Sequence, residues 1–174
     1  VVNLSLGSQS GTSQALINAI DRATAAGIVL VFSAGNEGQD GATPADYPGF
    51  LATNPSVSHG LIMIAGGLNS NGTVNPSSNP PGAAANWYLT APGWQIVVPD
   101  FGQSGPFDPT FESCFTTSAG ALCQIQGTSF ASPQVAGAVA LVMLVFPGMT
   151  PQQVVDLLFN TADDTGATGT DALN

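Results

Sequence analysis

The first residues of the chain have the pattern of a β-α-β unit, which restricts the folds that the chain can adopt. Val1 to Leu6 and Ile28 to Phe32 are short and apolar, as buried strands are. Between them, Ser10 to Ala26 repeats alanine, leucine and isoleucine on one helical face. A strand-helix-strand order favours a parallel pair joined by a right-handed crossover. We therefore expect an α/β fold with a ligand site beyond the carboxyl ends of these strands.

A serine at a glycine turn opens the most apolar part of the chain. Gly127-Thr128-Ser129 precedes Val135 to Phe146, a nearly uninterrupted apolar run that we interpret as a buried helix. A helix start leaves backbone N–H groups unpaired and carries the positive end of the helix dipole, so an anion formed beside Ser129 would be stabilised. Ser129 is therefore placed to act as a nucleophile. The alternative is that Thr128 or Ser129 only caps the helix.

The residues around Ser129 resemble the nucleophile motif of the subtilisin-like serine proteases. The similarity extends from Gly127 to Gly137, with Phe130 where Met is more usual and Gln134 where His is more usual. Val1 to Gly7 and Val29 to Gly38 also resemble blocks of that family, in the same order. The resemblance implies a subtilisin-like three-layer fold, in which helices cover both faces of a central and mostly parallel sheet.

The same resemblance implies a serine endopeptidase that works through an acyl-enzyme. Ser129 would attack the peptide carbonyl, and Asn36 would donate its side-chain amide to the oxyanion. Without the resemblance Asn36 reads as an ordinary turn residue, because Ala-Gly-Asn-Glu-Gly also suits a turn. The segments implied to bind the substrate backbone and to wall the primary specificity pocket are Ser5, Leu6 and Gly7 together with Ser33, Ala34 and Gly35.

Asp46 precedes a Tyr-Pro turn, where the family places the floor of that pocket. A carboxylate at this place could select Lys or Arg before the scissile bond. The alternatives are a loop aspartate that faces solvent or one that helps to hold a calcium ion. The resemblance implies chemistry that requires no metal and no cofactor, and a structural calcium ion is compatible with it.

The family activates its serine with a His and an Asp that lie earlier in the chain. Ahead of Ser129 this sequence has neither the Asp-Ser/Thr-Gly block nor the His-Gly-Thr block, and its single histidine, His59, lies in a polar loop that matches no catalytic position. We expect residues 1–174 to be the carboxyl-terminal part of one catalytic domain without an internal boundary, bound to an amino-terminal portion that carries the His and Asp. The alternative is a catalytically inactive subtilase-fold fragment or binding module.

The charge balance limits the partners of the chain. It has one basic residue among Lys and Arg and a formal net charge of −10, whereas phosphate contacts need many basic side chains. Nucleic acid is therefore excluded as a partner. The longest apolar run, Val135 to Phe146, is shorter than the ~20 residues of a membrane span. Proteins or peptides remain as the expected substrates.

Two cysteines, Cys114 and Cys123, flank a turn-forming stretch from Thr116 to Gly120. Two strands that fold back across this turn would bring the sulfur atoms together, so we expect a disulfide that closes a small loop. The alternative is a pair of reduced, buried cysteines; the residues that would complete a zinc site are missing. Since disulfides persist in oxidising compartments, a disulfide here predicts a secreted, extracellular protein.

Overall fold

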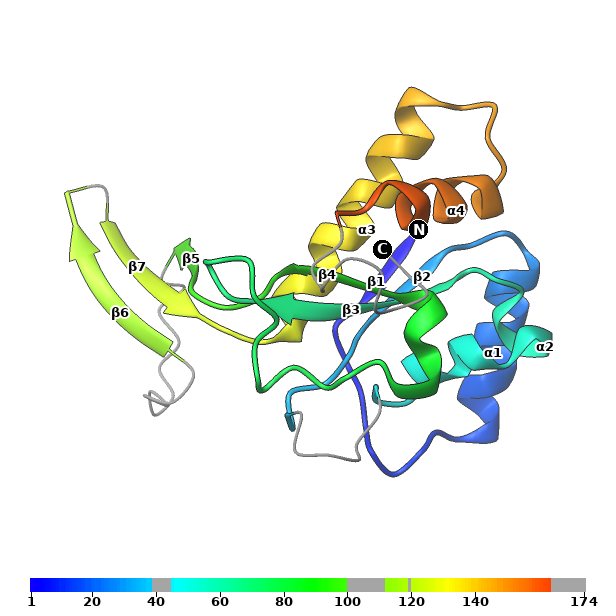
Figure 1. Cartoon of the computed structure of the whole chain (residues 1–174), viewed down its shortest axis with the longest axis horizontal. Helices are drawn as coiled ribbons and strands as arrows, with labels where there is room; N and C mark the ends of the chain where they lie inside the picture. The colour runs from blue at the N-terminus through cyan, green and yellow to red at the C-terminus, as the bar shows by residue number, and fades with distance from the viewer. Residues whose placement is uncertain (39–44, 100–111, 119, 164–174) are drawn as a thin grey trace.

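A parallel sheet forms the centre of the molecule. The computed structural model describes residues 1–38, 45–99, 112–118 and 120–163. Four strands pair in the order β1-β2-β3-β4, and all three pairings are parallel (Figure 1). Their bounds are β1 (Val2–Leu4), β2 (Leu30–Ser33), β3 (Ile62–Leu68) and β4 (Tyr88–Pro92).

Helices cover both faces of this sheet because the strands are apolar on both sides. Leu30 and Phe32 of β2 pack in one cluster with α1 (Gln14–Ala25) and α2 (Pro55–Ser58). The 3-10 helices η1 (Gly49–Thr53) and η2 (Gly82–Trp87) contribute to the same cluster. Val31, the residue between, packs in a second cluster with α3 (Thr128–Val145) and α4 (Pro151–Thr161). The three-layer α/β fold expected from the sequence is confirmed.

Side-chain caps fix where the helices begin. Ser13 accepts a hydrogen bond from the Leu16 N–H, so α1 starts after Ser13 rather than at Ser10. Thr150 and Gln153 form a reciprocal capping box at the start of α4. Both helices therefore start where polar side chains replace the missing intrahelical partners.

Two elements expected to be buried are exposed in the structure. β1 lies at the edge of the parallel sheet, and Val2 is 42% exposed. The second half of α3 carries Leu141 and Leu144 at 63% and 75% exposure. The expectation of full burial was wrong for both elements: among the described strands β1 pairs only with β2, and the second half of α3 is left exposed.

The helix α3 extends further than the apolar run that suggested it, since it begins at Thr128 and has 18 residues. Among the described residues it is the one helix that is long and apolar enough, by length and composition alone, to cross a membrane. Its residues Val135 and Val139 are buried against the sheet residues Met63 and Ala65. The part of α3 up to Val139 therefore packs as a core helix, whereas the remainder is largely exposed.

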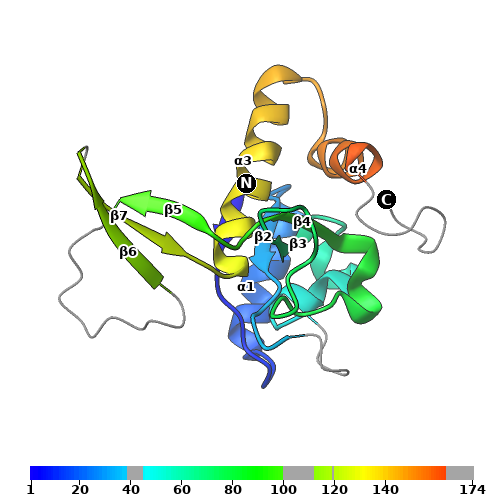
Figure 2. The ribbon, with the colours of Figure 1, turned by 60° about the vertical axis from the view of Figure 1, so that its left-hand side comes forward.

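A second sheet stands apart from the three layers. Strands β5 (Ile96–Pro99), β6 (Glu112–Thr117) and β7 (Gly120–Ile125) pair antiparallel in the order β5-β7-β6 and project from the body of the molecule (Figures 1 and 2). Cys114 lies directly opposite Cys123 in the β6–β7 hairpin, and the two form a disulfide. The predicted disulfide is therefore present, and β7 leads directly from it into Gly127.

The glycines of β3 let two aromatic rings pack closely against the sheet. A Cβ atom on Gly67 would overlap the indole ring of Trp94, which is buried. We therefore predict that Gly67→Ala lowers the free energy of unfolding of the complete protein by about 1–3 kcal/mol through overpacking. Denaturant unfolding measures this change, with Gly148→Ala as the control, because nothing lies within 4 Å of a Cβ at exposed Gly148. Equal stability of the two variants would contradict the prediction.

Candidate active site

The turn that carries Ser129 is held by the ends of two strands. Gly127 has a φ of 137°, a conformation that favours glycine, and it forms the N-cap of α3 without any side-chain cap. Thr128 and Ser129 are thus the first two helical residues, and the capping alternative is wrong for both. The Thr128 hydroxyl is fully buried and accepts a hydrogen bond from the Gly35 N–H, after β2, at 3.2 Å. The Ser5 hydroxyl, after β1, donates to the Ser129 carbonyl at 2.8 Å.

Asn36 lies directly beside this helix start. Its Oδ1 atom accepts from the Thr128 N–H at 2.8 Å and from the Thr128 hydroxyl at 3.0 Å. Because the oxygen end is engaged, the NH₂ end is left as a donor, and a Cβ atom on Gly127 would lie 3.5 Å from that nitrogen. The side chain of Asn36 thus bonds across 92 residues of sequence, which local turn chemistry does not require.

The two segments expected to bind substrate differ in exposure. Ser5, Leu6 and Gly7 are exposed, with Leu6 at 48%. Ser33 and Ala34 are 4% and 0% exposed, because Ser33 belongs to β2 and the Ala34 N–H bonds to the β3 carbonyl of Ala65 at 3.0 Å. The first segment therefore faces solvent, and the second is built into the sheet.

Asp46 lies between the glycines of these two segments. A Cβ atom on either Gly7 or Gly35 would come within 2.8 Å of Asp46 Oδ2. The Asp46 side chain is 6% exposed, so the alternative of a solvent-facing loop residue is wrong. Burial, and then the nearby negative charge of Glu37, raise the pKa of Asp46 to about 6. The carboxyl therefore changes charge just below neutral pH.

A buried asparagine that the sequence did not single out ties this acidic pair together. Asn79, fully buried, donates from Nδ2 to Glu37 Oε2 at 2.7 Å and to Asp46 Oδ1 at 3.3 Å. Its Oδ1 accepts the N–H groups of Glu37 and Gly38. Tyr88 donates its hydroxyl to the Asn79 carbonyl at 2.7 Å, and burial raises the pKa of Tyr88 to about 12. No motif marks Asn79, because its role depends on a contact made 42 residues away in sequence.

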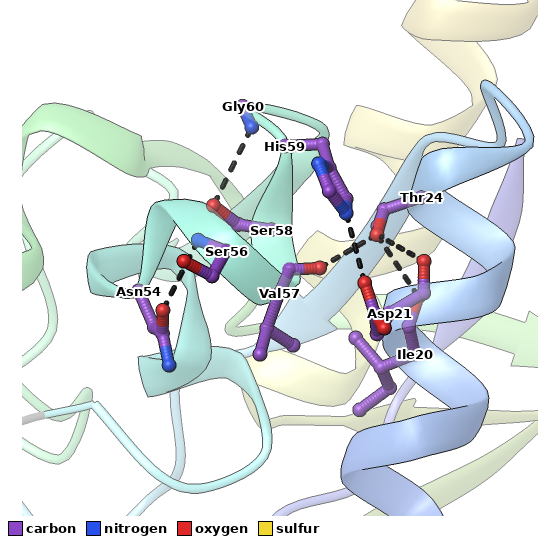
Figure 3. A network of polar contacts seen from close by, with 9 residues as sticks. All are labelled: Ile20, Asp21, Thr24, Asn54, Ser56, Val57, Ser58, His59 and Gly60. Atoms are coloured by element: carbon purple, nitrogen blue, oxygen red, sulfur yellow. Dashed lines mark hydrogen bonds and ion pairs between the residues drawn. The ribbon is translucent and has the colours of Figure 1, made fainter.

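His59 lies far from the nucleophile in the topology of the sheet. It ends α2 in a left-handed conformation and precedes β3, whereas Asn36 follows β2. Since β2 and β3 are parallel, Asn36 lies where the strands end and His59 lies where they begin, at opposite ends of the strands. His59 Nε2 contacts Asp21 Oδ1 of α1 at 2.8 Å (Figure 3). The pair lies beside Thr24, whose hydroxyl donates to the Val57 carbonyl and thereby joins α1 to α2.

The described residues do not complete a catalytic triad. His59 is the single histidine of the chain, and its partner Asp21 is on the layer opposite α3. An Asp-Thr-Gly triplet does occur at Asp164 to Gly166, behind Ser129 in chain order and outside the described residues. Among the described residues there is also no group of three His, Cys, Asp or Glu side chains that could hold a metal ion.

Comparison with solved structures identifies the fold. The prenylagaramide maturation protease PagA superposes with a TM-score of 0.67 at 23% identity, over 97% of this chain and 54% of that protein. The self-cleaved protease domain of PatA gives 0.65 at 24% identity, over 94% and 54%. At this level of identity the similarity concerns the fold alone.

Sequence comparison gives closer relatives. Subtilisin DY of Bacillus licheniformis is 34% identical over 95% of this chain and 50% of its own length. Subtilisin E of Bacillus subtilis (strain 168) is 35% identical over 93% and 35%. The chain therefore spans half or less of the length of these relatives. The sequence profile of the subtilase family, peptidase family S8, matches residues 1–173, and the chain belongs to this family.

Proposed function

We propose that this chain supplies the nucleophile and the oxyanion donor of a serine endopeptidase that cleaves proteins or peptides. Ser129 attacks the substrate carbonyl and forms the acyl-enzyme, and the Asn36 amide and the Ser129 N–H stabilise the oxyanion. The observation that carries this proposal is the bond of Asn36 Oδ1 to Thr128 at 2.8 Å. It holds the donating end of Asn36 beside the first turn of α3, where the unpaired N–H groups and the helix dipole already favour negative charge.

The general base and its orienting acid come from a separate amino-terminal portion in this proposal. A hydroxyl nucleophile is weak until a base removes its proton, and His59 lies at the opposite end of the strands. The second half of α3 carries exposed apolar side chains, and β1 is an edge strand of the parallel sheet. An apolar surface of this kind is typical of an interface. The amino-terminal portion is the occupant we propose for it.

Secretion agrees with the same proposal. The Cys114–Cys123 disulfide requires an oxidising compartment to persist. A relative that is 34% identical over 92% of this chain and 24% of its own length is named extracellular basic protease, from Dichelobacter nodosus. We place the mature enzyme outside the cell.

Loss of the Ser129 hydroxyl is the direct test of the proposed activity. In the complete enzyme, Ser129→Ala should abolish both peptide hydrolysis and labelling by a fluorophosphonate, while the circular dichroism spectrum stays unchanged. Because the base is on the other portion, this chain alone should react slowly, and adding the amino-terminal portion should restore rapid labelling. Hydrolysis within tenfold of wild type by Ser129→Ala, or rapid stoichiometric labelling of the isolated chain, would overturn the proposal. Complete absence of labelling in the assembled enzyme would favour the inactive binding module.

The role of Asn36 predicts a specific kinetic pattern. Asn36→Ala should lower kcat roughly 100-fold to 1000-fold and leave KM within a fewfold, because the amide acts chiefly when charge develops on the carbonyl oxygen. That magnitude comes from the equivalent experiment on subtilisin itself. Steady-state kinetics on a peptide amide measures it. An effect confined to KM would reassign Asn36 to substrate positioning.

Asp46 is our candidate for a specificity determinant of the same site. Its carboxylate lies between Gly7 and Gly35, in the two segments that we propose to flank the side chain before the scissile bond. The negative charges of Asp46 and Glu37 have no nearby counter-charge from this chain, since its one basic residue, Arg22, is on α1. A substrate Lys or Arg would supply the missing positive charge. We therefore propose a preference for basic residues at this position.

The raised pKa of Asp46 makes that preference dependent on pH. The carboxyl is neutral well below pH 6 and charged above it, so the ratio of kcat/KM for an arginine substrate to that for its uncharged citrulline analogue should rise between pH 5 and 7. We expect a rise of about tenfold or more, as for a charge-assisted hydrogen bond. The ratio cancels the titration of a base that serves both substrates. Asp46→Asn should remove the rise, and an unchanged profile in that variant would exclude the role.

A further inference from the structure

A proline in the first turns of α3 leaves the carbonyl of the nucleophile without its helical partner. In an α-helix the N–H of residue 133 would donate to the carbonyl of Ser129, four residues earlier. Residue 133 is Pro133, which lies inside α3 and has no N–H. The backbone oxygen of Ser129 therefore lacks the donor that an α-helix supplies at this position.

Ser5 provides this donor. Its hydroxyl lies 2.8 Å from the Ser129 carbonyl oxygen, although the two residues are 124 positions apart in sequence. Ser5 lies in the exposed segment directly after β1, the segment that we propose to bind the substrate backbone. One hydrogen bond thus connects that segment to the residue that attacks the substrate.

The orientation of the Ser5 hydroxyl is set by a chain of hydrogen bonds beneath it. The fully buried Ser132 donates to Asn3 Oδ1 at 2.6 Å. Because the oxygen of Asn3 is engaged in this way, its Nδ2 donates to Ser5 Oγ at 3.1 Å. The Ser5 hydrogen then donates to the Ser129 carbonyl at 2.8 Å rather than to the more distant Asn3 Oδ1 at 3.5 Å. In this series of hydrogen bonds, from Ser132 through Asn3 and Ser5 to Ser129, all donors point the same way, and each bond polarises the next.

We propose that Ser5 is a positioning residue of the acylation step, whose hydroxyl replaces the backbone N–H that Pro133 lacks. The inference rests on the proposed function of Ser129. Removal of the hydroxyl leaves the Ser129 carbonyl without a partner and frees the first turn of α3 to shift relative to the substrate segment. A displacement of the nucleophile slows the chemical step more than it weakens binding.

A double-mutant cycle with Pro133 separates this role from a direct contact between Ser5 and the substrate. Ser5→Ala in the complete enzyme should slow labelling by a small fluorophosphonate, which has no peptide to bind along the segment, by about tenfold. It should lower kcat for a peptide by a similar factor and leave KM within twofold. Ser5→Thr keeps a hydroxyl and should restore most of the rate. Ser10→Ala is the matched control and should have no effect, because Ser10 is exposed and its side chain bonds, within the described part of the chain, with the nearby Ser8.

The Pro133→Ala background gives the deciding comparison, because it restores an N–H to the helix at the correct position. There, adding Ser5→Ala should change the labelling rate by less than twofold. An equal loss in both backgrounds, or a loss seen only in KM, would overturn the proposal and make Ser5 a substrate contact. Thermal unfolding of the wild type, the two single variants and the double variant tests the hydrogen bond without relying on an activity assay. Ser5→Ala should lower Tm less in the Pro133→Ala background. Equal losses of Tm would exclude the bond itself, whereas a failure of the wild-type enzyme to label would refute the function of Ser129.

Discussion

The hydrogen bonds between Thr128 and the end of β2 organise the active site of this chain. Thr128 is fully buried and bonds to both Gly35 and Asn36, so it fixes the start of α3 against the carboxyl end of the central strand. The contact requires α3 to lie on one face of the parallel sheet, with its first turn at the carboxyl edge. The positions of Ser129 and of the Asn36 amide both follow from this single junction. A shift of α3 along the sheet would separate the proposed nucleophile from the proposed oxyanion donor.

Two acidic side chains lie close together near the carboxyl ends of these strands without a basic residue beside them. Asp46 and Glu37 share one buried amide, that of Asn79, and the chain has a single Arg and no Lys. Two carboxylates that approach each other in a partly dry environment disfavour simultaneous ionisation. The raised pKa of Asp46 follows first from its burial and then from the negative charge of Glu37. Such a site is poised for a positive charge that arrives from outside the chain.

The sequence was sufficient to predict the elements that depend on local pattern. The β-α-β unit, the apolar helix that follows Gly127 and the disulfide between Cys114 and Cys123 were all recoverable, because apolar periodicity and short sequence separation determine them. The burial of Asp46 and the part played by Asn79 were not. Both depend on contacts between segments far apart in sequence, and no local pattern distinguishes a buried asparagine from one in a surface loop. The exposure of the second half of α3 was missed for a different reason. An apolar run predicts that a helix face is covered, but it does not show whether this chain or another covers it.

The hydrogen bonds around Ser129 indicate which catalytic task this chain can perform and which it leaves to another portion. The hydrogen bonds that hold this turn, from Ser5 to the Ser129 carbonyl, from Gly35 to Thr128 and from Thr128 to Asn36, are made within this chain. In the proposed mechanism the stabilisation of negative charge is therefore preorganised here, with the donors fixed before a substrate arrives. The removal of the Ser129 proton has no counterpart among the described residues, because His59 lies at the opposite end of the strands, paired with Asp21. A partner portion that docks on the apolar side of α3 and β1 would therefore have to bring only the base and its orienting acid, and not the oxyanion site.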